Sequence, residues 1–430
     1  MAVTKRELEY YLVQLRRIAE HREDGAEKEI RRIYRALLKD LKQFIGYEYA
    51  ELAEDGRLTY SILQQKGEFA RFLEEVEQQI NNFSPQITSE ITAAVEETYR
   101  IVYDGMLDAV KQNTESEGLR RALDGLRSAT PETIKRTVEN PVSGLTLKDT
   151  LEKNRRDIIY DIKRNVAVGL SNGDRVDTMA KRISQSLDGD YQKAVRIART
   201  ESHRVQEAGF HDSAAEVDST LQNSDSGLRM VKTWRTMKDE RVRPQRRYKT
   251  KSGWKTVRRG TANHQKMEGA SVLMDEQFDL GGGVKADAPG QSGVASHDIN
   301  CRCFVEYDMM TDEEFFENTG KHFDGSVDKI SAEDIIKTEK QFGKKVGKHA
   351  SDWGLDPSSA SDRAKLEQII DDIILNHDQP VRIGEWKGQP EDVLFFIKGN
   401  DVVITKRNIE FITILKGGAS NGRVKDARER

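Results

Sequence analysis

Cysteine is scarce in this chain: its 430 residues include only 2, Cys301 and Cys303. Two cysteines separated by one residue cannot provide the framework of a disulfide-stapled secreted domain, so we expect a reducing, cytosolic environment. Long apolar runs are also lacking. No stretch approaches the roughly eighteen apolar residues of a membrane helix, and the N-terminus has no apolar segment of signal-peptide length. We therefore expect neither a membrane-spanning chain nor export through a signal peptide.

A large excess of charge of either sign is absent as well. The formal net charge of −4 gives no global signal for nucleic-acid binding, so any basic binding surface must be local. Hydrophobic residues make up 36% of the chain and charged residues 33%. This polar composition is typical of helix-rich proteins with large solvated faces, and the length is enough for roughly two to four domains.

Apolar residues recur at helical spacing through the N-terminal part of the chain, in three runs between residues 8 and 80 and in a fourth that follows. Ser84 and Pro85 predict the end of one helix and the start of the next. We interpret residues 1–125 as a helical bundle whose apolar stripes face one another; docking of one stripe onto a partner is the alternative. Glycines and prolines between residues 124 and 150 predict a domain boundary.

Three more helices are expected beyond this boundary. Thr146 and Asp149 have the spacing of a capping box at the start of a helix, which a turn at residues 171–174 then interrupts. Separate helices are predicted around residues 179–183 and around the Arg-Thr-Glu sequence that begins at Arg199. These helices would form the helical half of a central domain.

Polar motifs recur in short clusters from Ala198 to Tyr307. We expect a small domain held together by buried polar contacts, because breaking one partner of a buried ion pair is costly. The charged residues predicted to make these contacts are Arg199, Glu201, Arg204, Asp239, Arg241 and Arg243. The other conspicuous residues of the motifs are Trp234, His264, Cys301 and Cys303.

In this order the motifs resemble the head morphogenesis family of tailed bacteriophages, also called the Mu-F-like minor head proteins. The resemblance covers residues 145 to 307, and it departs from the family at Gln245 and Arg246, where a histidine often stands. It implies a central α+β domain over residues 145–310 that performs no catalysis and needs no cofactor. The fold class expected for the whole chain is mainly α with α+β parts.

The resemblance also implies a location in the virion and a set of binding partners. A minor head (capsid) protein would be associated with the portal and would take part in head assembly and in DNA packaging or delivery. Its partners would be the portal protein, capsid or scaffolding proteins and phage DNA, and no membrane. It would lie in the head interior or portal region of the virion, and in the host cytoplasm during assembly.

The most basic window of the chain runs from Lys232 to Arg259, with 12 lysines or arginines against 2 acidic residues. Clustered cations release counterions from nucleic acid, and the interspersed aromatic residues can stack on bases. A DNA-contacting hairpin is one interpretation, and a solvated β-ribbon is the other. The residues predicted to contact DNA are Arg241, Arg243, Arg246, Arg247, Lys249 and Lys251.

Two further segments of the central region carry weaker signals. Glycines and serines from Gly281 to Ser296 predict a long flexible loop without the pattern of a phosphate-binding loop. Cys301 and Cys303 would lie on one face of a strand, either as buried or free thiols or, with His264 and His297, as zinc ligands. Without a second cysteine pair we predict no metal.

Thr311 and Glu314 have the spacing of a capping box at the start of a short acidic helix. A separate pattern begins after a polar linker at residues 320–328 and fills residues 330–430. A helix is predicted from Asp362 to Leu375. Three apolar runs follow it, and their alternation with turn residues predicts an antiparallel meander. The predicted strands are residues 393–397, 401–405 and 410–415. This is a small α+β domain.

The C-terminal unit resembles the ribonuclease-like domains of the barnase, colicin and RelE type that are fused to phage head proteins and polymorphic toxins. The resemblance rests on Gly347-Lys348-His349 and on the final sheet with Lys416-Gly417-Gly418 and Asn421-Gly-Arg423-Val-Lys425. It implies RNA cleavage with His349 as the base or acid and with a cationic clamp on the phosphate. The candidate clamp residues are Lys398, Arg407, Arg423 and Lys425.

Two functions therefore stay open for the chain. The first is a purely structural phage head protein, in which His349 is an ordinary surface histidine. The second is a toxin-like ribonuclease carried on a head-protein module, with RNA and an immunity protein as further partners.

Overall fold

The computed structural model describes residues 5–140, 144–239, 242–250, 253–258, 262–327, 330–390 and 392–429. The chain is mainly α with α+β parts, as predicted. It forms two compact units. The first comprises residues 1–224, 259–262 and 277–305, and the second comprises residues 225–258, 263–276 and 306–430.

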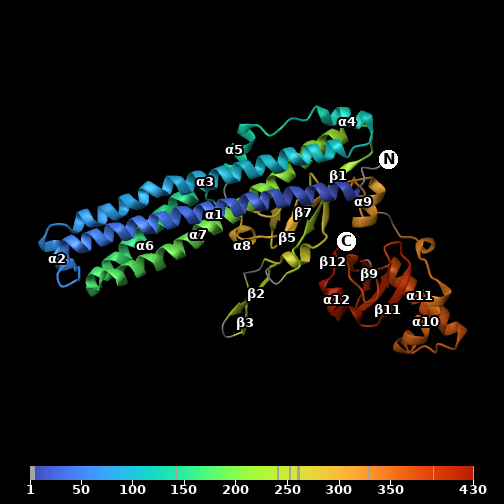
Figure 1. The fold of residues 1–430 in the computed structure, drawn as a ribbon. Helices are drawn as coiled ribbons and strands as arrows, with labels where there is room; N and C mark the ends of the chain where they lie inside the picture. The colour runs from blue at the N-terminus through green and yellow to red at the C-terminus, as the bar shows by residue number, and fades with distance from the viewer. Residues whose placement is uncertain are drawn as a thin grey trace. The chain divides into compact units, whose positions relative to one another are not determined.

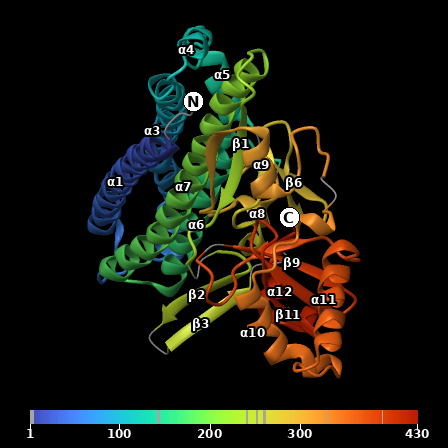
Figure 2. The same ribbon diagram turned by 90° about the vertical axis from the view of Figure 1, so that its right-hand side faces the viewer.

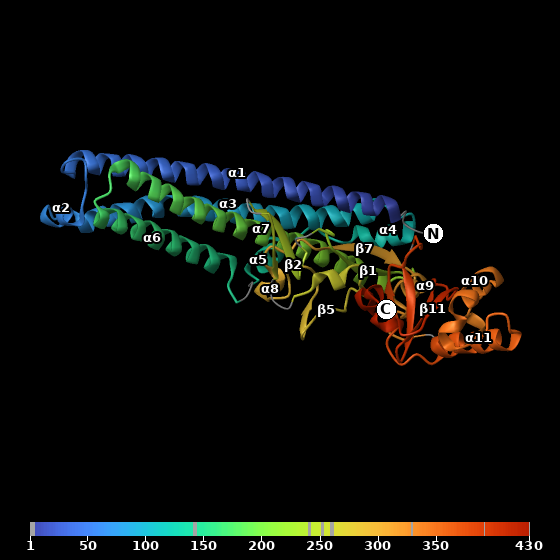
Figure 3. The same ribbon diagram turned by 90° about the horizontal axis from the view of Figure 1, so that it is seen from below.

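Four long helices dominate the first unit. Helices α1, α3, α6 and α7 pack side by side along their lengths (Figures 1 and 3). The helices of this unit are α1 Lys5–Leu52, α2 Tyr60–Gln65, α3 Phe69–Gln112, α4 Glu117–Asp124, α5 Pro131–Glu139, α6 Leu147–Asn172, α7 Val176–Gln222 and α8 Ala295–Asp298. A short hairpin joins β5 Phe278–Gly281 to β6 Val284–Ala286. Helices from both sides of the boundary predicted near residue 125 thus share one bundle.

Apolar stripes and local capping explain these helices. Leu12, Ile30 and Leu41 of α1 are buried at the spacing of one helical face. The predicted capping box at the start of α6 is present: Thr146 Oγ1 accepts from the Asp149 N–H, and Asp149 accepts from the Thr146 N–H. Gly173 ends α6 in the left-handed conformation, at φ 58°.

Two helix predictions were wrong. Pro85 was expected to separate two helices, but α3 continues through it. Proline removes one backbone donor, and the Ser84 hydroxyl next to it donates to the Ile80 carbonyl at 3.0 Å. The two helices expected around residues 179–183 and 199–201 are one helix, α7, because its buried apolar positions keep helical spacing through Gly189.

The second unit contains three sheets. The elements of its first part are β1 Arg229–Arg235, β2 Gln245–Thr250, β3 Gly253–Arg258, η1 His264–Met267, β4 Ser271–Leu273, β7 Phe304–Met310 and α9 Asp312–Thr319. One sheet has the order β4-β1-β7, and β2 pairs with β3 as a two-stranded antiparallel ribbon. The first two residues of β7 belong to the first unit. The capping box of α9, Thr311 with Glu314, forms as expected.

The C-terminal part of this unit is built around a five-stranded sheet of order β11-β10-β9-β8-β12 (Figure 2). Its elements are η2 Ala332–Asp334, α10 Glu339–His349, η3 Ala350–Trp353, α11 Ala360–Leu375, β8 Arg382–Gly384, β9 Val393–Lys398, β10 Asp401–Thr405, β11 Phe411–Leu415, η4 Gly418–Ser420, α12 Gly422–Asp426 and β12 Arg428–Glu429. The predicted meander is confirmed as β9, β10 and β11. Strands β8 and β12 were not predicted, because each is too short to show alternation.

Alternating residues along the strands of this sheet belong to two hydrophobic cores, one on each face. Leu394, Phe396 and Val403 pack with the apolar faces of α10 and α11. Phe395, Ile397 and other residues of opposite orientation pack with Val424 of α12 and with its neighbours. Both faces of the sheet are therefore covered.

Two segments of the first unit differ from the predictions. The glycine-rich stretch was expected to be a flexible loop, but it contains the β5–β6 hairpin, because Gly281, Gly282 and Gly283 supply the positive φ angles of its turn. Cys301 and Cys303 were expected in a strand; they lie in the loop just before β7. None of the helices in the described ranges combines the length and apolarity needed to cross a membrane.

Candidate functional site

Polar residues at the centre of α7 form a cluster of buried, hydrogen-bonded side chains in the first unit. Arg204 is 2% exposed, and its Nε donates to Glu201 at 2.9 Å. Its Nη1 donates to the Thr137 carbonyl at 2.8 Å and its Nη2 to the Val138 carbonyl at 3.2 Å. These carbonyls belong to the last turn of α5, where a helix has unpaired acceptors and attracts cations. Arg204 therefore anchors the end of α5 to α7.

Glu207, one turn further along α7, joins two distant segments. Its carboxylate accepts from the Val305 backbone N–H at 2.9 Å and from the Arg16 guanidinium. Arg16 also donates to the Val305 carbonyl at 2.6 Å and lies over the Phe210 ring, 4.4 Å from its centroid. The Glu207 carboxylate is fully buried, so these donors offset the free-energy cost of removing its charge from water.

A histidine and a cysteine occupy the same region. His203 of α7 hydrogen-bonds with Cys301, and its Nε2 is buried without a partner. Burial lowers the pKa of His203, but the hydrogen bond with Cys301 and the charge of Glu207 outweigh it, so the net shift is upward. Cys301 and Cys303 are both buried and unbridged.

Asp298 completes the cluster. It is 3% exposed, and its Oδ1 accepts from the Ser292 hydroxyl at 2.7 Å and from the Ser292 N–H at 3.1 Å. Its Oδ2 has no partner. Burial raises the pKa of Asp298, which the Ser292 donors only partly offset. Burial likewise raises the pKa of Glu201, with Arg204 opposing.

The predicted polar network is thus present in part. Glu201 and Arg204 form an ion pair, as expected. Arg199 faces away, with a side chain that is 52% exposed and paired with Glu27 and Glu23 of α1. Sequence reasoning missed Arg16, Glu207 and Asp298. Arg16 and Glu207 are 191 positions apart, so no local pattern could have paired them.

The predicted motif residues between β1 and η1 belong to the second unit. His264 begins η1 and is buried, with its ring edge-on to Trp234 at 5.4 Å. Asp239 is half-buried. His264 belongs to the second unit and the two cysteines to the first. The expectation of no metal, with zinc as its alternative, stays a prediction.

The predicted DNA-contacting residues are only partly described. Arg246, Arg247 and Lys249 lie on β2, which pairs with β3 along its length. Arg241 and Lys251 lie outside the described residues. Arg243 is 6% exposed, so it offers a DNA phosphate little surface.

The predicted catalytic residues of the C-terminal unit do not gather in one place. His349 ends α10; its Nδ1 lies 3.0 Å from the Asp352 carboxylate, and its Nε2 lies 3.4 Å from the Thr413 hydroxyl of β11. Lys398 ion-pairs with Asp372 of α11 at 2.7 Å.

The other predicted clamp residues lie elsewhere in this unit. Arg407 donates to Asn318. Arg423 and Lys425 are exposed on α12, whose Val424 carbonyl accepts from Arg382 of β8. Strands β10 and β9 separate β11 from β8 in the sheet. Arg423 and Lys425 therefore lie on an element remote from His349.

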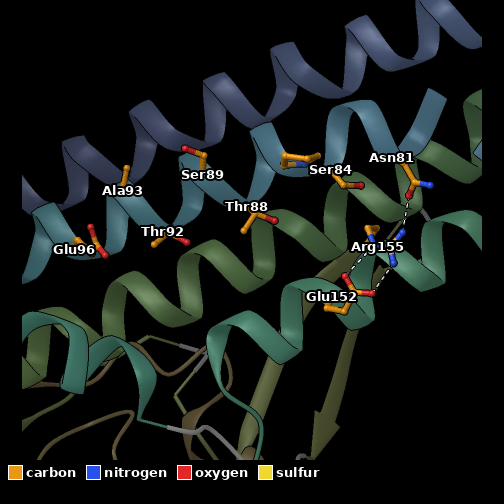
Figure 4. A pocket seen from close by; sticks show the side chains of 10 residues that line it. Asn81, Ser84, Thr88, Ser89, Thr92, Ala93, Glu96, Glu152 and Arg155 are labelled. Atoms are coloured by element: carbon orange, nitrogen blue, oxygen red, sulfur yellow. Dashed lines mark hydrogen bonds and ion pairs between the residues drawn. The ribbon is translucent and has the colours of Figure 1, made fainter. Parts of the chain in front are cut away.

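A surface groove runs along α3 beside the start of α6 (Figure 4). Its volume is about 760 Å³. Small hydroxyl side chains line it, and Arg155 closes one end by donating to Asn81 at 2.5 Å and to Glu152 at 2.6 Å. The hydroxyl-bearing residues are Ser84, Thr88, Ser89 and Thr92. This lining holds no histidine, cysteine or lysine that could act as base or nucleophile.

Comparison with known proteins finds a matching family and similar sequences. Residues 160–251 match the family described as phage Mu protein F like protein. The chain is 29% identical over 283 residues to the minor head protein GP7 of Bacillus phage SPP1, which is 66% of this chain and 82% of that protein. It is 26% identical over 271 residues to the NAD(+)–arginine ADP-ribosyltransferase EFV of Enterococcus faecalis, which is 63% of this chain and 49% of that protein. No solved structure matches. The matched family segment contains the Arg199–Arg204 motif of α7 around which the polar cluster is built, and the predicted resemblance to the phage Mu protein F-like family is therefore confirmed.

Proposed function

We propose that the chain is a minor head protein of a tailed bacteriophage or prophage, associated with the portal and acting in head assembly and DNA packaging or delivery. The observation that carries the proposal is the match to a minor head protein along 82% of that protein's length. The polar cluster on α7 supports a structural role, because its charged groups are buried and joined to backbone groups rather than presented to a substrate.

Virion composition tests this function. Mass spectrometry of purified, DNA-filled particles should detect the chain, and cross-linking should join it to the portal protein. Particles assembled without the gene should be defective in head assembly or DNA delivery. Filled, infectious particles that lack the chain would refute the proposal.

DNA contact through the β2–β3 ribbon is part of the same proposal. Neutralising Arg246 and Arg247 to glutamine should lower the slope of log affinity against log salt by about 1.8 on duplex DNA, because each phosphate contact contributes about 0.9. The matched control is the neutralisation of two exposed lysines elsewhere in the second unit, Lys321 and Lys387. Equal slopes for the ribbon variant, the control and the parent would remove the ribbon from the DNA-contacting surface.

A toxin-like ribonuclease carried on the head module is the second candidate. One observation favours it: the pairing of His349 with the Asp352 carboxylate. A carboxylate that orients a histidine is the arrangement a general base requires. Full-length protein incubated with total RNA should cleave it, and His349→Ala should abolish cleavage while His377→Ala does not. Intact RNA with the folded parent protein would leave the structural function alone.

A further inference from the structure

Helix α10 presents one face to the C-terminal sheet and the opposite face to solvent. Phe342 and Val346 pack into the core that α10 shares with the sheet, and Gln341 donates to the Ile412 carbonyl at 2.6 Å. These contacts fix the rotation of the helix. Lys340, Lys344 and Lys348 are all exposed.

The exposed face of α10 is a row of cations. Lys340, Lys344 and Lys348 follow one another at intervals of four residues, so they stack along one side of the helix. Lys345 is half-buried beside them. From α11, the exposed Arg363 reaches over this helix: its Nη2 would lie 3.7 Å from a Cβ at Gly343.

These five positive charges are not neutralised within the described part of the chain. The ion pairs of this region involve other cations: Asp362 binds Lys365, and Glu367 and Asp371 bind Lys337. Burial lowers the pKa of Lys345, and the charges of Lys348 and Lys344 lower it further. The cations therefore repel one another in the free protein.

Helix electrostatics do not explain the row. A cation near a helix C-terminus is favourable, which accounts for Lys348, but Lys340 lies in the first turn, where the helix dipole disfavours positive charge. Gly347 adds a second anomaly. A Cβ at this position would meet nothing within 4 Å, so packing within the chain does not require glycine, which weakens a helix. A glycine beside cations lets an external group approach the backbone closely.

We propose that the face of α10 formed by Lys340, Lys344, Gly347 and Lys348, together with Arg363, binds the phosphate backbone of a nucleic acid. The spacing of the lysines offers successive phosphates a line of donors, and the absence of partner carboxylates among the described residues leaves their charges available. This surface differs from the cations predicted from the sequence, and it does not depend on the head-protein function.

Binding of the full-length protein to labelled single-stranded RNA and to labelled duplex DNA, each titrated with salt, tests the proposal. The double variant Lys344→Gln/Lys348→Gln should lower the slope of log affinity against log salt by about 1.4 on the single strand or about 1.8 on the duplex. The probe on which the slope changes identifies the nucleic acid. Lys321→Gln/Lys387→Gln, which removes the same charge from exposed positions elsewhere in the second unit, should leave the slope unchanged.

A glycine variant gives a second readout that loss of folding cannot mimic. Gly347→Ala should raise the melting temperature of the protein, because alanine favours helix, and should weaken binding several-fold by obstructing the backbone. The proposal is overturned if the α10 double variant and the control have the same slopes on both probes. It is also overturned if the α10 lysines affect binding only to phosphatidylserine vesicles.

Discussion

The ion pair between Glu201 and Arg204 should contribute strongly to the stability of the first unit. Both side chains are buried, and the Glu201 carboxylate is the counter-charge that the Arg204 guanidinium contacts. Glu201→Ala leaves this buried guanidinium without its counter-charge, which should destabilise the fold by about 3 to 5 kcal/mol. Urea unfolding followed by far-UV circular dichroism measures this loss.

Arg199 supplies the matched control for that prediction. It belongs to the same motif, but its side chain is 52% exposed and its ion pairs reach α1 at the surface. Exposed ion pairs contribute about 0 to 1 kcal/mol, so Arg199→Ala should have a small effect. Comparable losses for the two variants would contradict the distinction between buried and exposed motif residues.

Asp298 should make the stability of the first unit depend on pH. Burial raises its pKa in the folded state, so the proton-bound form favours folding. This contribution is fully present below the unfolded pKa of about 3.9 and is lost as the pH rises through the folded pKa. Asp298→Asn, which keeps an oxygen acceptor for Ser292, should therefore gain stability over the parent as the pH rises from about 4 to 7. Urea unfolding of both proteins at a series of pH values measures this gain.

Asp149 provides a control of the opposite sign. The hydrogen bond from Thr146 lowers the pKa of Asp149. Its contribution is therefore present above the unfolded pKa and is lost as the pH falls through the folded pKa. Asp149→Asn should lose stability relative to the parent at neutral pH. If the two variants show the same sign of change between acidic and neutral pH, the roles given to these two carboxyls are wrong.

At the scale of single residues, the sequence identified charged residues that form buried ion pairs, but it did not identify the distant residues with which some of them pair. Glu201 and Arg204 are three positions apart, and their pairing could be predicted from a helix. Glu207 and Arg16 could not be paired, because the packing of α1 on α7 brings them together. The ribonuclease interpretation requires His349 beside cations such as Arg423, but the order of the strands places the elements of these two residues apart.

Helix α3 should become more stable without its proline. Pro85 is exposed, so its ring has little packing to lose, and its missing N–H breaks the backbone ladder inside the helix. Pro85→Ala should raise the unfolding free energy by about 1 to 3 kcal/mol. Pro131→Ala is the control: this proline lies at the start of α5, where it is favoured, so its removal should bring no gain. A loss of stability on Pro85→Ala, measured by urea unfolding, would show that α3 depends on the proline.

Capping boxes and apolar alternation predicted elements well because both are local signals. The starts of α6 and α9 and the meander β9-β10-β11 were found in this way. The continuity of α3 through Pro85 depends on the packing of this helix against α1 and against α6. These tertiary effects override the usual breaking rule.

The first unit should require the segment from residue 277 to residue 305. This segment supplies the Val305 N–H that Glu207 accepts and the Ser292–Asp298 loop that contacts the cluster. A chain that ends at residue 276 leaves Glu207 buried with fewer donors, a cost of about 1 to 3 kcal/mol for this group alone. We expect it to melt below a chain that ends at residue 327, as measured by circular dichroism. Equal melting temperatures would show that the segment is dispensable.

Because the chain passes from one unit to the other and back, recombination between related genes is compatible with the fold only at certain positions. Residues 225–258 and 263–276 belong to one unit, while the segments on either side, including residues 277–305, belong to the other. A genetic crossover between residues 225 and 276 would give Glu207 of α7 a foreign segment 277–305 in place of the one that supplies its Val305 donor. Phe315 of α9 and Phe323 pack with Val231 and Leu273, so a crossover after residue 327 would instead exchange the C-terminal sheet and its helices as a block. Hybrid genes should therefore join after residue 327, so that related viruses exchange C-terminal modules while the helical module and its returning segment are inherited together.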